Sequence, residues 1–289
     1  MDNTDQPKPV APESDATSEP DPQLSLWSSD AVAQQEAVTS APAALYPPWS
    51  LSDIAAFILF VFVSFIVVNM TAITGYLALA QYFDWSVSMN EALTQTSFVI
   101  IVQGGWEILW LVFIYFLITI KYKQYFWSAI QWNRTPQAPA LFLMAGVLLA
   151  FSTQAVFILL PSDKELPIER LFSSPFSAYL LAGFGICVAP FVEELVFRGF
   201  LYPVFEQKLG LFPAVWLTAL VFAAIHVPQL SGGWQEIVAI FFVGAAFSYC
   251  RGKTRSLLPP YLMHVAYNAS LFVGLYFSTD RFQSLKNQL

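Results

Sequence analysis

The sequence predicts an all-α fold, a polytopic membrane bundle of about seven transmembrane helices that follows a disordered, acidic N-terminal tail. The first observation is that only 11% of the 289 residues are charged, against roughly 25% in ordinary soluble domains. The second is a series of long uncharged runs, of which the first, residues 54–83, exceeds the roughly 20 residues that a span needs. The third is the concentration of proline, serine and acidic residues before residue 49.

The acidic balance of the chain belongs to this tail. Residues 1–50 contain eight acids and one base, Lys8, which accounts for the whole formal net charge of -7. The other 239 residues contain 12 acids and 12 bases. Eight of the 19 prolines lie in residues 1–48, where aromatic and β-branched residues are scarce. Such a segment buries too little apolar surface to offset its ordering entropy. We therefore expect a disordered tail, and we exclude a basic nucleic-acid-binding protein.

The body of the chain contains seven runs that we expect to cross the lipid bilayer. They are residues 54–83, 94–120, 135–162, 171–192, 209–235, 237–250 and 256–279. Tryptophans near their ends suit an interfacial aromatic belt, and these are Trp49, Trp85, Trp127, Trp132 and Trp234. We counted the Lys and Arg residues in the expected loops and left out Arg198. Eight lie on the N-terminal side of the membrane, Arg251 among them, and four lie on the other side. Positive loops stay cytoplasmic, so we expect the cytoplasmic membrane with a cytoplasmic N-terminus.

Polar residues interrupt the apolar runs in the second half of the chain. A charged side chain within a span costs roughly 2.5 to 3.5 kcal/mol, which makes each of these residues a functional candidate. The set consists of Glu193, Glu194, Arg198, His226, His264 and Asn268. The chain has no other histidines.

Helical spacing separates the members of the first group. Glu194 and Arg198 are four residues apart, so they share a helix face and are expected to form an ion pair. Glu193 lies about 100 degrees around the helix, outside that pair and free to titrate. A structural ion pair that only stabilises the helix explains Glu194 and Arg198 as well as a direct role in the site does.

The same spacing orders the second group. His264 and Asn268 share one face and can present two donors to a developing oxyanion. Phe222 precedes His226 by one helical turn and is expected to orient its ring. Taken alone, His226 would be read as a donor that links two helices. The convergence of Glu, His, His and Asn on successive helical runs favours a site instead.

Two further acids fit structural roles better. Glu107 lies near Gln103 and has no histidine or asparagine beside it in the sequence, which favours an intramembrane hydrogen bond or a place at a rim. Glu236 follows Gly232 and Gly233 at an expected helix start, where a negative charge suits the helix dipole.

A carboxylate and an imidazole in a dry cavity can activate a water molecule as general base. A second histidine and an asparagine can then stabilise the oxyanion, which amounts to peptide hydrolysis without a covalent intermediate. Zinc held by Glu, His and His is the alternative. The chain has no HExxH motif and no GxSxG motif, so the metal-free route is favoured and no cofactor is expected.

Three motifs carry a resemblance to a known family. EELVFR has the form EExxxR, FAAIH the form FxxxH and HVAYN the form HxxxN, in that order over roughly residues 175–275. The sequence resembles the CPBP family (CAAX proteases and bacteriocin-processing enzymes, also called Abi), which includes the type II CAAX prenyl endopeptidases. The resemblance implies an all-helical intramembrane glutamic protease. It implies that Glu193 activates water with help from His226, that His264 and Asn268 stabilise the oxyanion, and that Glu194 and Arg198 support them.

The expected function is therefore an intramembrane endopeptidase that cuts a membrane-associated protein or peptide. A non-proteolytic membrane scaffold or bacteriocin-immunity-type protein is the alternative, and a transporter is a weaker third. The expected organisation is a tail (1–48), N-terminal transmembrane helices (49–170), a CPBP-like catalytic core (171–279) and a C-terminal tail (280–289).

Overall fold

The computed structural model describes residues 47–84, 88, 95–159 and 166–284. Contacts divide the chain after Ala43, and all described residues belong to the second part, Ala44–Leu289. The expected disordered tail lies outside the described residues except for Pro47 and Pro48. The boundary expected between residues 170 and 171 stays a prediction.

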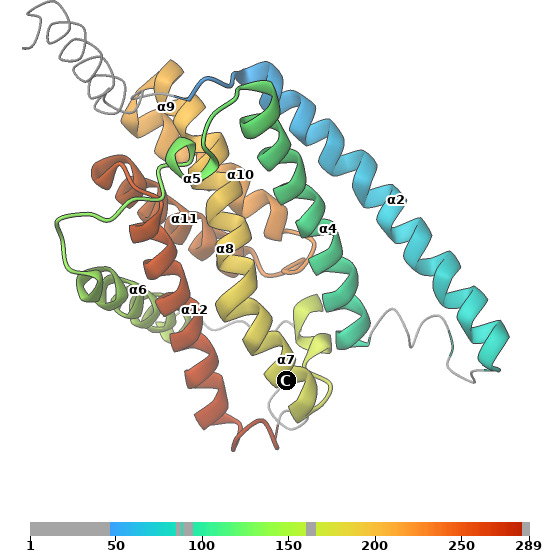
Figure 1. Ribbon diagram of the computed structural model, residues 1–289. Coiled ribbons are helices and arrows are strands. Elements are labelled where there is room, and N and C mark those ends of the chain that lie inside the picture. Colours follow the sequence, from blue (N-terminus) through green and yellow to red (C-terminus); the bar gives the residue numbers. More distant parts are fainter. Residues whose placement is uncertain (1–46, 85–87, 89–94, 160–165, 285–289) are drawn as a thin grey trace, which may run out of the picture. The chain divides into compact units, whose positions relative to one another are not determined.

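The described residues form helices and the turns that join them, which confirms the all-α prediction (Figure 1). The first half contains α2 (Leu51–Phe83), α4 (Thr96–Phe116), η1 (Leu117–Lys121), α5 (Phe126–Ala129) and α6 (Pro139–Leu159). A 3-10 turn, η2 (Pro167–Leu171), leads into α7 (Pro175–Gly183), η3 (Phe184–Val188), α8 (Ala189–Glu194), η4 (Leu195–Leu201) and α9 (Tyr202–Leu209). The chain continues as α10 (Leu211–His226), α11 (Trp234–Thr254) and α12 (Leu258–Ser278).

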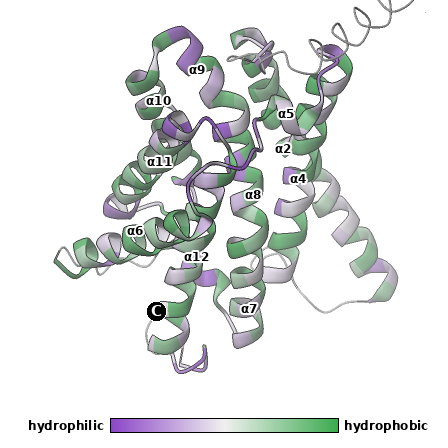
Figure 2. Cartoon of the chain, turned by 60° about the vertical axis from the view of Figure 1, so that its left-hand side comes forward, coloured by the Kyte–Doolittle hydropathy of each residue, from purple (hydrophilic) through white to green (hydrophobic). Residues whose placement is uncertain are grey.

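Within the described part, five helical segments are long and apolar enough to cross a membrane. They are Leu51–Phe83, Thr96–Lys121, Pro139–Leu159, Pro175–Leu209 and Trp234–Thr254. Helix α10 is apolar but shorter, and α12 has 21 residues. Figure 2 shows apolar residues along much of the outer surface of these helices, as contact with lipid requires. The chain is an integral membrane protein.

One expected span ends earlier than its apolar run. We expected a single segment over residues 209–235, but α10 ends at His226 and residues 227–232 form turns. The cause is Pro228, which has no N–H to continue the helical ladder and which disfavours helical geometry at the residue before it. His226 therefore lies at the end of a helix rather than in the middle of one.

Trp49 does not belong to an interfacial belt, which corrects the prediction for this residue. Its side chain is 1% exposed, its ring stacks on Phe200 with centroids 5.6 Å apart, and its Nε1–H donates to the Phe200 carbonyl at 2.9 Å. Trp127 and Trp234 are 41% and 62% exposed, as a belt requires. Trp85 lies outside the described residues.

The close approach of α6 to α12 depends on a glycine. A Cβ added to Gly146 would lie 2.2 Å from the carbonyl oxygen of Met263 and 2.9 Å from the Cβ of Ala266. No side chain fits at Gly146 without moving the α12 backbone. Since His264 follows Met263 directly, this contact helps to set the position of the helix that carries His264.

Candidate active site

The helical run Pro175–Leu209 carries the first motif and lies beside α12 (Figure 1). Glu193 and Glu194 are the last two residues of α8, and Arg198 lies in the π-helical turn η4. For the spacing of the first motif we assumed a regular α-helix, and a π-helical turn is wider. The pairing expected from that spacing is nevertheless present.

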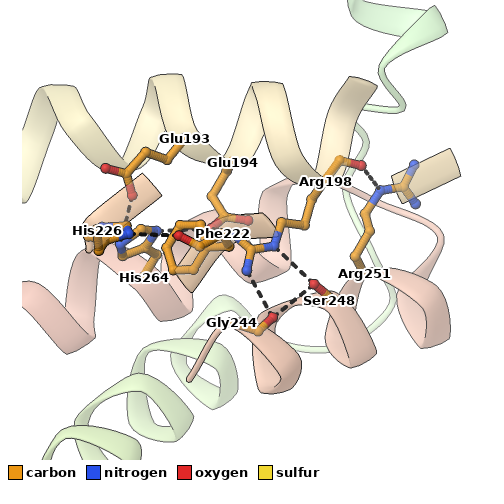
Figure 3. Close-up of polar contacts among 9 residues, drawn as sticks. All are labelled: Glu193, Glu194, Arg198, Phe222, His226, Gly244, Ser248, Arg251 and His264. Atoms are coloured by element: carbon orange, nitrogen blue, oxygen red, sulfur yellow. Dashed lines mark hydrogen bonds and ion pairs between the residues drawn. The ribbon is translucent and has the colours of Figure 1, made fainter. Parts of the chain in front are cut away.

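Glu194 and Arg198 form a fully buried ion pair. Arg198 Nη1 donates to Glu194 Oε1 at 2.8 Å, and both side chains are 0% exposed. The guanidinium also donates from Nε to Ser248 Oγ at 3.2 Å and from Nη2 to the Gly244 carbonyl at 2.8 Å (Figure 3). Phe222 covers it, with Cζ of Arg198 4.4 Å from the ring centroid. A charge taken out of water needs such complete pairing.

A glycine on α11 allows the guanidinium to come this close. A Cβ at Gly244 would lie 2.9 Å from Cδ1 of Phe222 and 3.4 Å from Nη2 of Arg198. Ser248, one turn further along α11, donates its own hydroxyl to the Gly244 carbonyl at 2.8 Å. Sequence reasoning missed both residues, because a glycine and a serine in an apolar run carry no signal of what they face.

His264 joins the two glutamates. Its Nδ1 lies 2.9 Å from Glu194 Oε1, and its Nε2 lies 3.7 Å from Glu193 Oε2. Because the Glu194 carboxylate oxygen accepts, Nδ1 carries the hydrogen, and in a neutral ring Nε2 carries the lone pair. One carboxylate oxygen of Glu194 thus holds both Arg198 and His264. The side chain of Glu193 is 17% exposed, so it is the more open acid of the pair.

His226 is held in a similar way by its own helix. Its Nδ1 donates to the Phe222 carbonyl at 2.8 Å, and the two rings are 4.8 Å apart and tilted. The expected orienting contact with Phe222 is therefore present. Since a carbonyl can only accept, Nε2 of a neutral His226 again keeps its lone pair. Figure 3 shows both imidazoles on the side of the helix to which Glu193 points.

Asn268 faces the same helical run as His264, but one turn further along α12. Its Nδ2 donates to the Gly185 carbonyl at 2.7 Å. The amide group has two donor hydrogens, so this bond uses one and orients the other. The structure thus brings Glu193, Glu194, Arg198 and His264 into one connected cluster, with His226 and Asn268 on helices packed around it.

Glu107 lies on α4, which packs against η4, the turn that carries Arg198. Its Oε1 accepts from Gln103 Nε2 at 2.8 Å, as expected. The side chain is buried, and within the described part of the chain its Oε2 has no hydrogen-bond partner. Glu236 lies in the first turn of α11, as expected.

Among the described residues, no three His, Cys, Asp or Glu side chains are arranged to hold a metal ion. We therefore derive no step through zinc. An open apolar cavity of about 350 Å³ lies beside the site, on another face of the helical run, and Phe191 and Leu195 contribute to its lining.

Arg251 corrects the count of loop charges. We assigned it to a cytoplasmic loop, but α11 continues to Thr254 and the side chain of Arg251 is 2% exposed. Its Nε donates to the Arg198 carbonyl at 3.0 Å (Figure 3). An arginine at the end of an apolar run looks like a loop residue in a sequence, because nothing in the pattern shows the acceptors that hold it.

The fold and the site together define a polytopic membrane protein with an intramembrane cluster of glutamate, arginine and histidine. Residues 175–270 match the model of a protein family, the type II CAAX prenyl endopeptidase Rce1-like family. No curated protein and no solved structure matched the chain. The matched residues contain all three motifs. The match therefore confirms the resemblance that those motifs indicated. It supports an endopeptidase of the CAAX-protease type in general.

Proposed function

We propose that the protein is an intramembrane glutamic endopeptidase that hydrolyses a peptide bond of a membrane-associated protein or peptide. The observation that carries this proposal is the position of His264, whose ring lies between Glu194 at 2.9 Å and Glu193 at 3.7 Å within a buried helical core. The gap at Glu193 is longer than a hydrogen bond. The more open acid is therefore not fully engaged by the protein and has capacity for a water molecule.

In this proposal Glu193 takes a proton from water, with His226 assisting through the nitrogen that its contact with Phe222 leaves free. The hydroxide adds to the substrate carbonyl carbon. His264 and Asn268 donate to the oxyanion that results, and Glu193 returns the proton to the leaving amine. Donation to the oxyanion by His264 requires a hydrogen on its Nε2, the ring nitrogen that faces Glu193. The family match suggests substrates of the CAAX type, so a peptide with a prenylated C-terminal cysteine is the first substrate to test.

The test is peptide cleavage by the purified full-length protein in detergent, with a fluorogenic library that includes prenylated and unprenylated C-terminal peptides. We expect cleavage by the wild type and none above background from Glu193→Ala or His226→Ala. Cleavage that survives both substitutions contradicts the mechanism. A chelator arm separates the routes, because activity abolished by chelation and restored by zinc would favour the metal-dependent alternative.

A further inference from the structure

In the helical run that carries the first motif, a proline removes the regular backbone donor of one carbonyl. In η4 the N–H of Tyr202 bonds the carbonyl of Phe197, five residues back. In the same register the donor to the Arg198 carbonyl would be residue 203, which is a proline and has no N–H. A buried carbonyl left without a donor costs about 1 to 3 kcal/mol. The turn that carries Arg198 therefore needs a donor from elsewhere.

The first π-helical turn of the run shows the same pattern. In η3 the N–H of Ala189 bonds the carbonyl of Phe184, and residue 190 is again a proline. The carbonyl left over is that of Gly185, and it accepts from Asn268 Nδ2 at 2.7 Å. At both places a proline removes a backbone donor and a side chain of another helix replaces it.

Arg251 supplies the replacement donor in η4. Its Nε donates to the Arg198 carbonyl at 3.0 Å, while its Nη2 donates to Gln131 Oε1 at 2.6 Å. Gln131 in turn accepts from the backbone N–H of Leu257 through its own carbonyl, at 2.9 Å. A planar guanidinium can donate to two acceptors in fixed directions from one side chain. The bond to Arg198 is therefore held from two sides rather than by one flexible contact.

We propose that Arg251 is a positioning residue of the candidate active site, which replaces the donor removed by Pro203 and so fixes the turn from which Arg198 holds Glu194. The effect that we expect on the cleavage rate rests on the proposed function. Arg251 touches no reacting group. It acts along a chain of contacts, from the Arg198 carbonyl through the Arg198 guanidinium to Glu194 Oε1 and from there to His264 Nδ1.

The kinetic arm of the test compares Arg251→Met with the matched control Lys253→Met in the full-length protein. Lys253 lies on the same helix, is exposed and contacts the ring of Tyr249. We expect Arg251→Met to lower kcat by about 10- to 100-fold, as small misplacements of reacting groups do, with KM within about twofold. Arg251→Lys should recover only part of the loss, and Lys253→Met should match the wild type.

The second arm does not depend on activity. The chain has only two histidines, so ¹⁵N-histidine labelling gives two imidazole signal sets, and His226→Gln assigns them. We expect Arg251→Met to shift the His264 signals and leave those of His226 in place. Lys253→Met should shift neither set. A general loosening of the fold would move both.

The outcomes separate the two proposals. If the wild type cleaves no peptide, the proposed function fails, and the histidine spectra alone decide the role of Arg251. If Arg251→Met is folded and keeps the wild-type kcat or the wild-type His264 signals, the inference about Arg251 is overturned. Should Arg251→Met not fold, Arg251→Lys and Gln131→Met, which removes the second acceptor, are judged by the same two readouts.

Discussion

Glu194 Oε1 is the atom on which the buried charges converge. It accepts from Arg198 at 2.8 Å and lies 2.9 Å from His264 Nδ1, whereas Oε2 of the same residue has no hydrogen-bond partner among the described residues. Spacing in the sequence predicted the pair within one helix, because residues four apart share a face. It did not predict the bridge to His264, because a contact between helices 70 residues apart depends on their packing.

Loss of one partner of this pair is expected to cost more than loss of both. Arg198→Met leaves Glu194 buried and uncompensated, so we expect the free energy of unfolding to fall by about 3 to 5 kcal/mol. Adding Glu194→Gln should restore part of that loss. Unfolding in detergent measures both variants, and a double variant that is less stable than Arg198→Met would contradict the pairing argument.

At the scale of elements, the order and most bounds of the helices follow from uncharged runs. The joint between α9 and α10 at Gly210 and the start of α12 at Leu258 lie within a few residues of expectation. The early end of α10 at His226 and the π-helical turns around Pro190 and Pro203 were not predicted. These irregularities depend on the positions of prolines, which lack a backbone N–H. A hydropathy pattern carries no information about a missing N–H.

The contact between α6 and α12 predicts the effect of one methyl group. Gly146→Ala places a Cβ against the Met263 carbonyl, which is backbone and cannot rotate away. We expect a loss of about 1 to 3 kcal/mol in stability, together with lower activity because α12 carries His264. Gly75→Ala on α2 is the matched control, since nothing lies within 4 Å of its Cβ position. Equal stability of the two variants would contradict the packing described here.

For the whole molecule, the low content of charged residues predicts a membrane protein. The candidate site is predicted from the few polar residues that interrupt its apolar runs. Arg251 shows the limit of that reasoning. As a loop charge it supported the orientation, but it is buried in α11. Removing it from the count leaves seven positive residues on the N-terminal side against four on the other, so the expected orientation is the same.

We expect the N-terminal side to be cytoplasmic, and single cysteines test it in a variant with Cys187 and Cys250 replaced. Lys208→Cys and Arg281→Cys lie at exposed positions near opposite ends of the expected spans. An impermeant thiol reagent added to intact cells should label Arg281→Cys and spare Lys208→Cys until the cells are opened. The reverse pattern would contradict the expected orientation. Labelling of both positions would place them on the same side of the membrane, which would contradict the odd number of spans expected between them.

The central claim is that Glu193 activates the attacking water, and its most direct measurement is the single-turnover cleavage rate of Glu193→Gln against Glu236→Gln at equal amounts of folded protein. Both substitutions exchange a carboxylate for an amide of nearly the same shape. We predict that Glu193→Gln loses at least about 100-fold, the lower range of a general base, and that Glu236→Gln cleaves like the wild type. Wild-type cleavage by Glu193→Gln would contradict the account.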